Sequence, residues 1–267
     1  MHVGDTARNW RRLPLTKKTD RIARMKTIPP QFERTHILIG DSGLEKLAGK
    51  HVFVAGLGGV GSYCAEALAR AGIGRLTLVD HDKVAASNIN RQLPALFSTV
   101  GQSKAELMLE RIRDINPACR VVIHRAFLTE ENMHDHVPAD ADYVIDAIDS
   151  LACKVALVVS SYKRGLKVAS SMGAGNRLDP SRIRLVDISQ TMMCPLARVM
   201  RKRLQRHGVR KGILAVFSDE VPSAPLPPVA VDGPGRARAV NGTISYMPPL
   251  FGLMLAGEVI RRLLQGD

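Results

Sequence analysis

Cysteine is scarce in this chain of 267 residues, and its four cysteines stand singly, with no C-x-x-C pair. That spacing disfavours a structural zinc knuckle and a redox dithiol, and it favours a reduced, cytoplasmic setting. The opening residues also lack an apolar stretch that ends in small residues, so we expect no secretory signal.

Long uncharged apolar runs are missing as well. The longest apolar window, residues 247–264, contains two prolines and three charged side chains. A membrane-spanning helix needs about 20 apolar residues. The window therefore predicts a buried C-terminal helix, and we expect no contact with a membrane.

Acidic residues are sparse in two segments, which carry much of the formal net charge of +13. Residues 1–28 are basic and lack hydrophobic periodicity, so we interpret them as a disordered tail. The second segment, residues 195–211, contains no acid, and its apolar residues Leu196, Val199, Met200 and Leu204 recur at helical spacing.

A helix over the second segment would bury this apolar stripe and turn its cations outward. The cations that we expect to contact nucleic acid are Arg198, Arg201, Lys202, Arg203 and Arg206. A merely solvated helix face is an equally good interpretation of such a run. Aromatic residues make up only 4% of the chain, which disfavours a stacking platform for single strands and favours phosphate contacts.

Short apolar segments alternate with helical patterns between residues 51 and 171. The expected strands are 51–55, 75–80, 119–125, 143–148 and 167–171. The expected helices are 62–71, 103–115, 130–136 and 151–164. Strands separated by helices of this length pair in parallel. We therefore expect an α/β fold with a doubly wound, Rossmann-like, mainly parallel sheet that binds its ligand at the carboxyl ends of the strands.

The alternation breaks after about residue 176. Residues 183–188, 214–218 and 242–247 are strand-like, which predicts a mixed, partly antiparallel C-terminal extension of the same sheet. Residues 222–235 contain five prolines and are expected to form a mobile loop. We divide the single domain, residues 29–267, into a nucleotide-binding half at about 50–175 and a substrate-facing extension at about 176–267.

A glycine-rich turn joins the first expected strand to the first expected helix. Gly56, Gly58 and Gly61 fit G-x-G-x-x-G, with Gly59 between them. Glycines in such a turn let backbone N–H groups and the helix N-terminus approach phosphate. Asp80 ends the second strand, where a carboxylate can accept hydrogen bonds from ribose. This context predicts a nucleotide site, but the turn alone does not separate a nicotinamide dinucleotide from ATP.

The polar residues that follow favour ATP. They are Asp82, Asn88, Arg91, Gln92 and Lys104. A dehydrogenase needs no cationic cluster of this kind, whereas chemistry that expels pyrophosphate needs positive charge on the phosphates. Asp146 and Asp149 end a further strand, where a carboxylate suits Mg²⁺. Asp149 could instead cap the helix that follows.

Together these motifs resemble the adenylating enzymes related to ubiquitin activation and to molybdopterin and thiamin sulfur-carrier activation. The matching segments are Gly56–Gly61, Asp80-x-Asp82, Ser87–Gln92, Gly101-x-x-Lys104 and Asp146–Asp149. Within that superfamily, residues 34–40, 144–150 and 195–198 resemble the tRNA threonylcarbamoyladenosine dehydratase branch. The resemblance covers about residues 30–264.

The resemblance implies that the enzyme uses ATP and Mg²⁺ to adenylate the threonine carboxylate of threonylcarbamoyladenosine beside the tRNA anticodon. Ring closure then expels AMP. It also implies a homodimer in which Arg34 reaches the partner's ATP phosphates. By the same resemblance, Asn88, Arg91 and Lys104 contact phosphate, Asp80 binds ribose and Asp149 holds the metal. The catalytic set is then Arg34, Arg91, Lys104 and Asp149.

Three other functions stay open. The nearest is adenylation of the C-terminal glycine of a ubiquitin-like sulfur carrier, although enzymes of that kind often carry two C-x-x-C zinc pairs. An NAD-dependent oxidoreductase leaves Arg91, Lys104 and Asp149 unexplained, and a non-catalytic RNA-binding module has no need of them. Cys194 is expected to be structural rather than a nucleophile, and a cysteine desulfurase partner stays open.

Overall fold

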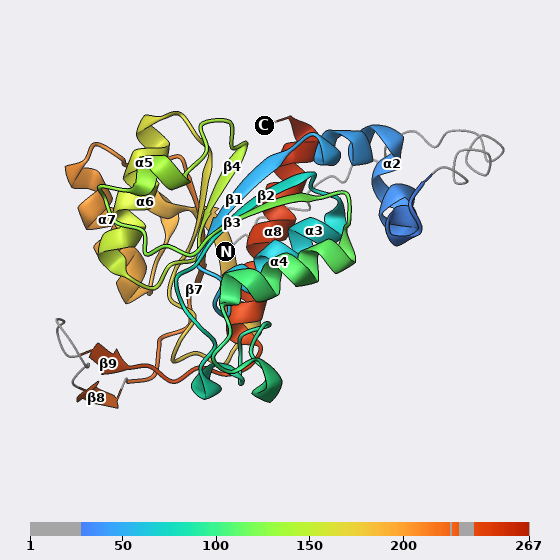
Figure 1. Ribbon diagram of the computed structural model, residues 1–267. Coiled ribbons are helices and arrows are strands. Elements are labelled where there is room, and N and C mark those ends of the chain that lie inside the picture. The colour runs from blue at the N-terminus through green and yellow to red at the C-terminus, as the bar shows by residue number, and fades with distance from the viewer. Residues whose placement is uncertain (1–27, 225, 230–237, 267) are drawn as a thin grey trace, which may run out of the picture.

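The computed structural model describes residues 28–224, 226–229 and 238–266. The predicted basic tail lies outside the described residues except for residue 28, and so do residues 225 and 230–235 of the proline-rich segment. The described chain forms one large sheet with helices on both faces and a separate pair of short strands (Figure 1).

Seven strands form the large sheet in the order β3-β2-β1-β4-β5-β7-β6. Their bounds are β1 (His51–Ala55), β2 (Arg75–Val79), β3 (Arg120–His124), β4 (Tyr143–Asp146), β5 (Val168–Ser171), β6 (Ile183–Asp187) and β7 (Ile213–Ser218). Neighbouring strands pair in parallel except β6, which runs antiparallel to β7. The predicted mainly parallel, doubly wound sheet with an antiparallel extension is confirmed.

Helices cover both faces of this sheet (Figure 1). One face carries α2 (Glu33–Ala48), α3 (Gly61–Ala71), α4 (Lys104–Ile115) and α8 (Met247–Gln265). The other carries α5 (Met133–His136), α6 (Leu151–Lys163) and α7 (Pro195–Arg206). Because strand side chains alternate between faces, Val54 packs in the first core while its neighbours Phe53 and Ala55 pack in the second.

The C-terminal helix α8 is buried against α3, as the sequence predicts. The contact is close, because a Cβ atom on Gly252 of α8 would overlap the carbonyl oxygen of Val60. Among the described helices, none combines the length and the apolar character that a membrane crossing requires. Five short 3-10 helices complete the described part of the chain, at Pro30–Phe32, Ala86–Asn88, Phe97–Thr99, Pro180–Arg182 and Ile188–Gln190.

Three predictions of secondary structure are wrong. Residues 242–246 form no strand, and Met247 already begins α8, whose first turn accommodates Pro248 and Pro249 because its N–H groups need no helical partner. The proline-rich segment contains β8 (Leu226–Val229), which pairs antiparallel with β9 (Arg238–Val240) and does not join the large sheet. Of the helix expected at 130–136, only the turn Met133–His136 forms.

Candidate active site

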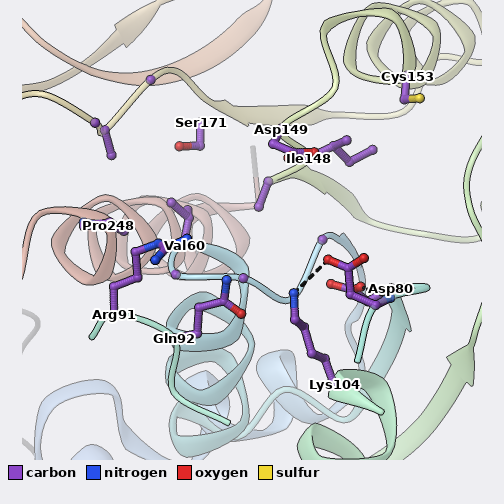
Figure 2. A pocket seen from close by; sticks show the side chains of 18 of the residues that line it. Val60, Asp80, Arg91, Gln92, Lys104, Ile148, Asp149, Cys153, Ser171 and Pro248 are labelled. Carbon is purple, nitrogen blue, oxygen red and sulfur yellow. Dashed lines mark hydrogen bonds and ion pairs between the residues drawn. The ribbon is translucent and has the colours of Figure 1, made fainter. Parts of the chain in front are cut away.

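A crevice of about 370 Å³ opens at the carboxyl ends of the parallel strands, where the order of the sheet reverses between β1 and β4. One wall is built by the glycine turn after β1, the end of β2 and the N-terminus of α4. The opposite wall is built by the segments after β4 and β5, the N-terminus of α7 and residues 241–243 before α8. Figure 2 shows the side chains that line the crevice.

The glycine turn is tight because two backbone segments meet inside it. Gly56 has a φ of 86°, a left-handed conformation that side chains disfavour. A Cβ atom on Gly61 would overlap the carbonyl oxygen of Gly56. Gly58 and Gly59 line the crevice, whereas Gly61 lies behind them at the start of α3. Apart from Val60, the turn therefore presents backbone rather than side chains to a ligand.

Asp80 ties the end of β2 to this turn. Its carboxylate accepts hydrogen bonds from the backbone N–H groups of Leu57 at 2.6 Å and of Asp82 at 2.8 Å. The side chain is 8% exposed, and burial raises its pKa despite these two donors. Asp80 thus fixes the turn and still lies at the crevice, where the predicted ribose contact requires it.

Lys104 delivers positive charge to the same wall. It is 4% exposed, and its Nζ donates to the Asp82 carboxylate at 2.8 Å. The backbone N–H of Lys104 also donates to the carbonyl oxygen of Asp82 at 3.1 Å. Both side chains line the crevice, so the lysine is held where phosphate oxygens can compete for it.

Arg91 and Gln92 line the crevice beside the glycine turn. The Arg91 guanidinium donates to the carbonyl oxygen of Ser87 at 2.9 Å and to Asn90 Oδ1 at 2.8 Å. Gln92 is buried, and its Oε1 has no hydrogen-bond partner among the described residues. A ligand that donates a hydrogen bond would satisfy this oxygen.

Asn88 does not line the crevice. Its Oδ1 accepts from the backbone N–H of Ala85 at 3.1 Å, and its carbonyl oxygen accepts from Arg91 and Gln92. The structure thus gives Asn88 a local role, which is to shape the loop that carries Arg91.

The two carboxylates after β4 lie in different environments. Asp149 is exposed at the crevice, and Ser150 is the N-cap of α6, so Asp149 is not the capping residue. Asp146 is fully buried and accepts from Lys154 at 2.8 Å and from Ser170 at 2.6 Å. Burial raises the pKa of Asp146. The sequence suggested that one carboxylate faces the crevice, but it did not reveal the lysine partner of the other.

A cation would find carboxylate oxygens on both sides of the crevice. Asp80, His81 and Asp82 place one ligand atom each within 4.8 Å of one another. Their oxygens are engaged, however, by Leu57, by the Asp82 backbone and by Lys104. Asp149 has no partner among the described residues, and its hard oxygen donors suit Mg²⁺.

Arg34 lies on α2, a helix that the sequence analysis did not predict, and it does not line this chain's crevice. The side chain is exposed near the start of α2. Ile37 and Leu38 on the same helix are exposed as well, at 44% and 79%. The structure thus separates Arg34 from the other predicted catalytic residues of the same chain.

The predicted basic helix is α7. It buries Ala197, Met200 and Leu204 and turns most of its cations outward. The expected stripe is wrong at one position, because Val199 is 38% exposed. Arg201 is half-buried and donates to the carbonyl oxygen of Thr191 at 2.8 Å. The exposed cations of α7, which point outward, are therefore Arg198, Lys202, Arg203 and Arg206, and the last two line a second pocket beside α6.

Sequence reasoning missed the wall opposite the glycine turn. The missed residues are Ser171 at the end of β5, Met172 to Gly175 after it, Leu196, Asn241 and Thr243. Glycine and small residues just after a strand were the available signal. Cys153 also lines the crevice, whereas Cys194 is 3% exposed and does not.

Comparison with known proteins gives a consistent set of relatives. The model of the ThiF family matches residues 32–267. A tRNA threonylcarbamoyladenosine dehydratase of Bacillus subtilis is 43% identical over 241 residues, which cover 88% of this chain and 95% of that protein.

Solved structures of the tRNA N6-threonylcarbamoyladenosine dehydratase of Escherichia coli are also similar. Its complex with ATP has a TM-score of 0.80 and 37% identity, covering 88% of this chain and 94% of that one. Its complex with AMP has a TM-score of 0.79 over the same shares. The resemblance drawn from the sequence motifs is confirmed.

Proposed function

The chain is an enzyme of the ThiF family, and we propose that it uses ATP to dehydrate threonylcarbamoyladenosine beside the anticodon of tRNA. The observation that carries the proposal is one crevice that gathers the glycine turn, Asp80, Arg91 and Lys104 on one wall and leaves the opposite wall open to a second ligand. The names of the relatives supply the substrate.

The first step is adenylation. A carboxylate oxygen of the substrate's threonyl group attacks the α-phosphorus of ATP, and pyrophosphate leaves. Arg91 and Lys104 stabilise the negative charge that accumulates on the phosphates, because fixed cations in a crevice act without reorganising. Asp80 and the glycine turn hold the nucleotide, so that attack and departure lie in line.

The second step is ring closure. A nucleophilic atom of the substrate itself attacks the acyl carbon and expels AMP, so the net change in the nucleoside is the loss of one water. Activation is necessary because a free carboxylate resists attack, whereas its acyl adenylate carries a good leaving group. No enzyme thioester is needed, in keeping with Cys194 being buried outside the crevice.

Mg²⁺ is part of the proposal. Bound to ATP, the ion would neutralise phosphate charge. Asp149 is the residue that would hold it, because its carboxylate faces the crevice and has no partner in the described chain. We expect Asp149→Asn to raise the Mg²⁺ concentration needed for half-maximal activity.

A homodimer is the second part of the proposal. Arg34 is exposed on α2, away from its own crevice, beside the exposed Ile37 and Leu38. We infer that Arg34 completes the crevice of a second copy. Inactive Arg34→Ala and Lys104→Ala chains, mixed and reassembled, should then regain activity, because one crevice of each mixed dimer is intact. Mixtures that stay inactive would contradict this inference.

The outward cations of α7 are proposed to contact tRNA phosphates. Arg198, Lys202, Arg203 and Arg206 lie on one helix whose N-terminus, at Leu196, reaches the crevice. An RNA whose modified base enters the crevice would pass its neighbouring phosphates along this helix.

The test is mass spectrometry of nucleosides after incubating this protein with Mg-ATP and tRNA carrying threonylcarbamoyladenosine, with hydrolysis mild enough to preserve a cyclic product. We expect the mass of the modified nucleoside to fall by one water. One AMP should form for each product molecule. Unchanged tRNA would refute the proposal. ATP–pyrophosphate exchange that needs a ubiquitin-like carrier protein would instead establish sulfur-carrier adenylation.

A further inference from the structure

The crevice wall after β5 has hydrogen-bonding capacity that the described chain leaves unused. Gly173, Ala174 and Gly175 follow β5 after one intervening residue, Met172, and all three line the crevice. Among the described residues, none of their backbone N–H groups has an acceptor, although the neighbouring Met172 and Asn176 N–H groups are both paired. We call these three residues the Gly173–Gly175 cradle.

A buried arginine lies behind the cradle. Arg177 is 4% exposed, and its Nη1 donates to the carbonyl oxygens of Gly173 at 2.8 Å and Gly175 at 3.1 Å. The carbonyl and the N–H of one trans peptide group point in opposite directions. By drawing the Gly173 carbonyl towards itself, Arg177 therefore turns the N–H of Ala174 away from itself.

The charge of Arg177 is uncompensated. Its Nε and Nη2 are buried without a hydrogen-bond partner, and no carboxylate pairs with it among the described residues. A buried charge without a counter-ion is costly, so an anion in front of the cradle would offset a cost that the folded protein carries without one.

The cradle is also held in place from the side. Asn176 adopts a left-handed φ of 59°, its N–H donates to the carbonyl oxygen of Gly242 at 2.8 Å, and its Oδ1 accepts from the Gly242 N–H at 2.6 Å. Its Nδ2 donates to Asn241 Oδ1 at 2.9 Å. This clamp joins the cradle to the segment before α8, so the donors are fixed before a ligand arrives.

We propose that the Gly173–Gly175 cradle, with Arg177 behind it, binds the carboxylate that is adenylated. This inference rests on the proposed function and names the part of the crevice that recognises its acyl substrate. The wall opposite already provides Arg91, Lys104 and the glycine turn for the phosphates of ATP. A carboxylate in the cradle would therefore face the nucleotide across the crevice. Arg177 acts as a positioning residue, because the backbone of the cradle separates it from the ligand.

The experiment uses an anticodon stem-loop RNA that carries threonylcarbamoyladenosine, either as the free acid or as its methyl ester. Binding is measured with an ATP analogue whose α,β-bridge is not cleaved. We expect the wild-type protein to bind the acid about tenfold more tightly than the ester, from the strength of hydrogen bonds to charged groups. Equal binding of acid and ester by the wild type overturns the proposal.

Three variants separate charge from packing. Arg177→Gln keeps a donor for the two carbonyl oxygens and removes the charge. We therefore expect this variant to bind the acid and the ester about equally. Arg177→Lys carries a charge only while the buried amine stays protonated, so it should restore the preference at low pH and lose it as the pH rises. Arg113→Gln removes a cation from the exposed last turn of α4 and should leave the preference unchanged. An Arg177→Gln protein that still prefers the acid tenfold contradicts the proposal.

The same titrations identify the anion. Affinity for the ATP analogue should be equal in the wild type and in Arg177→Gln. If it falls while the acid preference stays, the cradle binds phosphate and the proposal is wrong. Nucleoside mass spectrometry with the wild-type protein tests the proposed dehydration separately from carboxylate binding by the cradle. Product without an acid preference refutes the cradle alone, whereas no product from the wild type refutes the proposed function.

Discussion

The two walls of the crevice differ in how their charged groups and hydrogen-bond donors are paired. On the nucleotide wall, Asp80, Asp82 and Lys104 are joined to one another and to the backbone by short hydrogen bonds. On the opposite wall, the three N–H groups of the cradle and two nitrogens of Arg177 have no partner among the described residues.

This difference has a physical consequence. A wall whose charges are already paired keeps its shape without a ligand, and a phosphate must compete for Lys104. A wall whose donors have no protein partner gains more from an anion, since the ligand displaces only water and breaks no bond within the protein. We therefore expect substitutions on the nucleotide wall to abolish chemistry, and substitutions behind the opposite wall to change which acyl group is accepted.

The largest effect should come from the nucleotide wall. Lys104→Ala removes a buried cation beside the phosphates and should lower the rate of ATP–pyrophosphate exchange by at least about 100-fold. Unfolding should stay cooperative, because Asp82 is half-exposed and can be solvated when its partner is lost. The matched control is Lys83→Ala, an exposed lysine next to Asp82, the partner of Lys104, that does not line the crevice. Full exchange activity in Lys104→Ala would refute its assignment to the phosphates.

The second effect concerns a buried ion pair beneath the opposite wall. Asp146 at the end of β4 accepts from Ser170 on β5 and pairs with Lys154 on α6, all within the core. Lys154→Met leaves a buried carboxylate alone and should lower the free energy of unfolding by about 3–5 kcal/mol. Chemical denaturation measures this change. Lys167→Met, at an exposed lysine before β5, should change it by less than about 0.5 kcal/mol. Similar losses in both variants would contradict the buried pair.

The same contrast explains how far the sequence alone could lead. The nucleotide wall was predictable, because its glycines, acids and cations lie in short segments at the ends of strands that the hydrophobic pattern locates. The opposite wall combines the end of β5, the start of α7 and residues 241–243, which are distant in the chain. Lone glycines and a single arginine carry no recognisable spacing.

The errors in the fold have related causes. Residues 242–247 have strand-like composition, but the prolines that follow start a helix. Four residues of a proline-rich segment form the strand β8. Proline has no N–H to donate, but each strand of an isolated pair has one unpaired edge that needs no donor. The pairing of Asp146 with Lys154 depends on the packing of α6 against the sheet, which no local pattern encodes.

A third prediction contrasts exposed cations with the buried Arg177. Arg198→Gln and Lys202→Gln should each reduce the slope of log affinity for tRNA against log salt concentration by about 1. Arg201→Gln should reduce it less, because that guanidinium is engaged by Thr191. The effect of Arg177→Gln on the acid preference should be nearly independent of salt, since buried charges are poorly screened. Filter binding of tRNA at several salt concentrations measures these slopes for each variant. An equal slope change in Arg201→Gln would show that its bond to Thr191 breaks when RNA binds.

The smallest effect lies at the amino ends of the strands, opposite the crevice, where a polar group is buried for structure alone. His51 begins β1, is 3% exposed, and bonds to Thr77 at 2.9 Å and to Asp140 at 3.0 Å. Burial lowers its pKa below the ordinary 6.5. Because the folded protein then binds fewer protons than the unfolded chain, stability should fall as the pH drops from 6.5 through the lowered pKa. Comparing the free energy of unfolding at pH 7.5 and below 6.5 measures the loss, and His51→Gln should make it smaller. Some loss should persist in that variant, since burial and the charge of His136 also lower the pKa of His124. An unchanged pH dependence in His51→Gln would assign the whole effect to other groups.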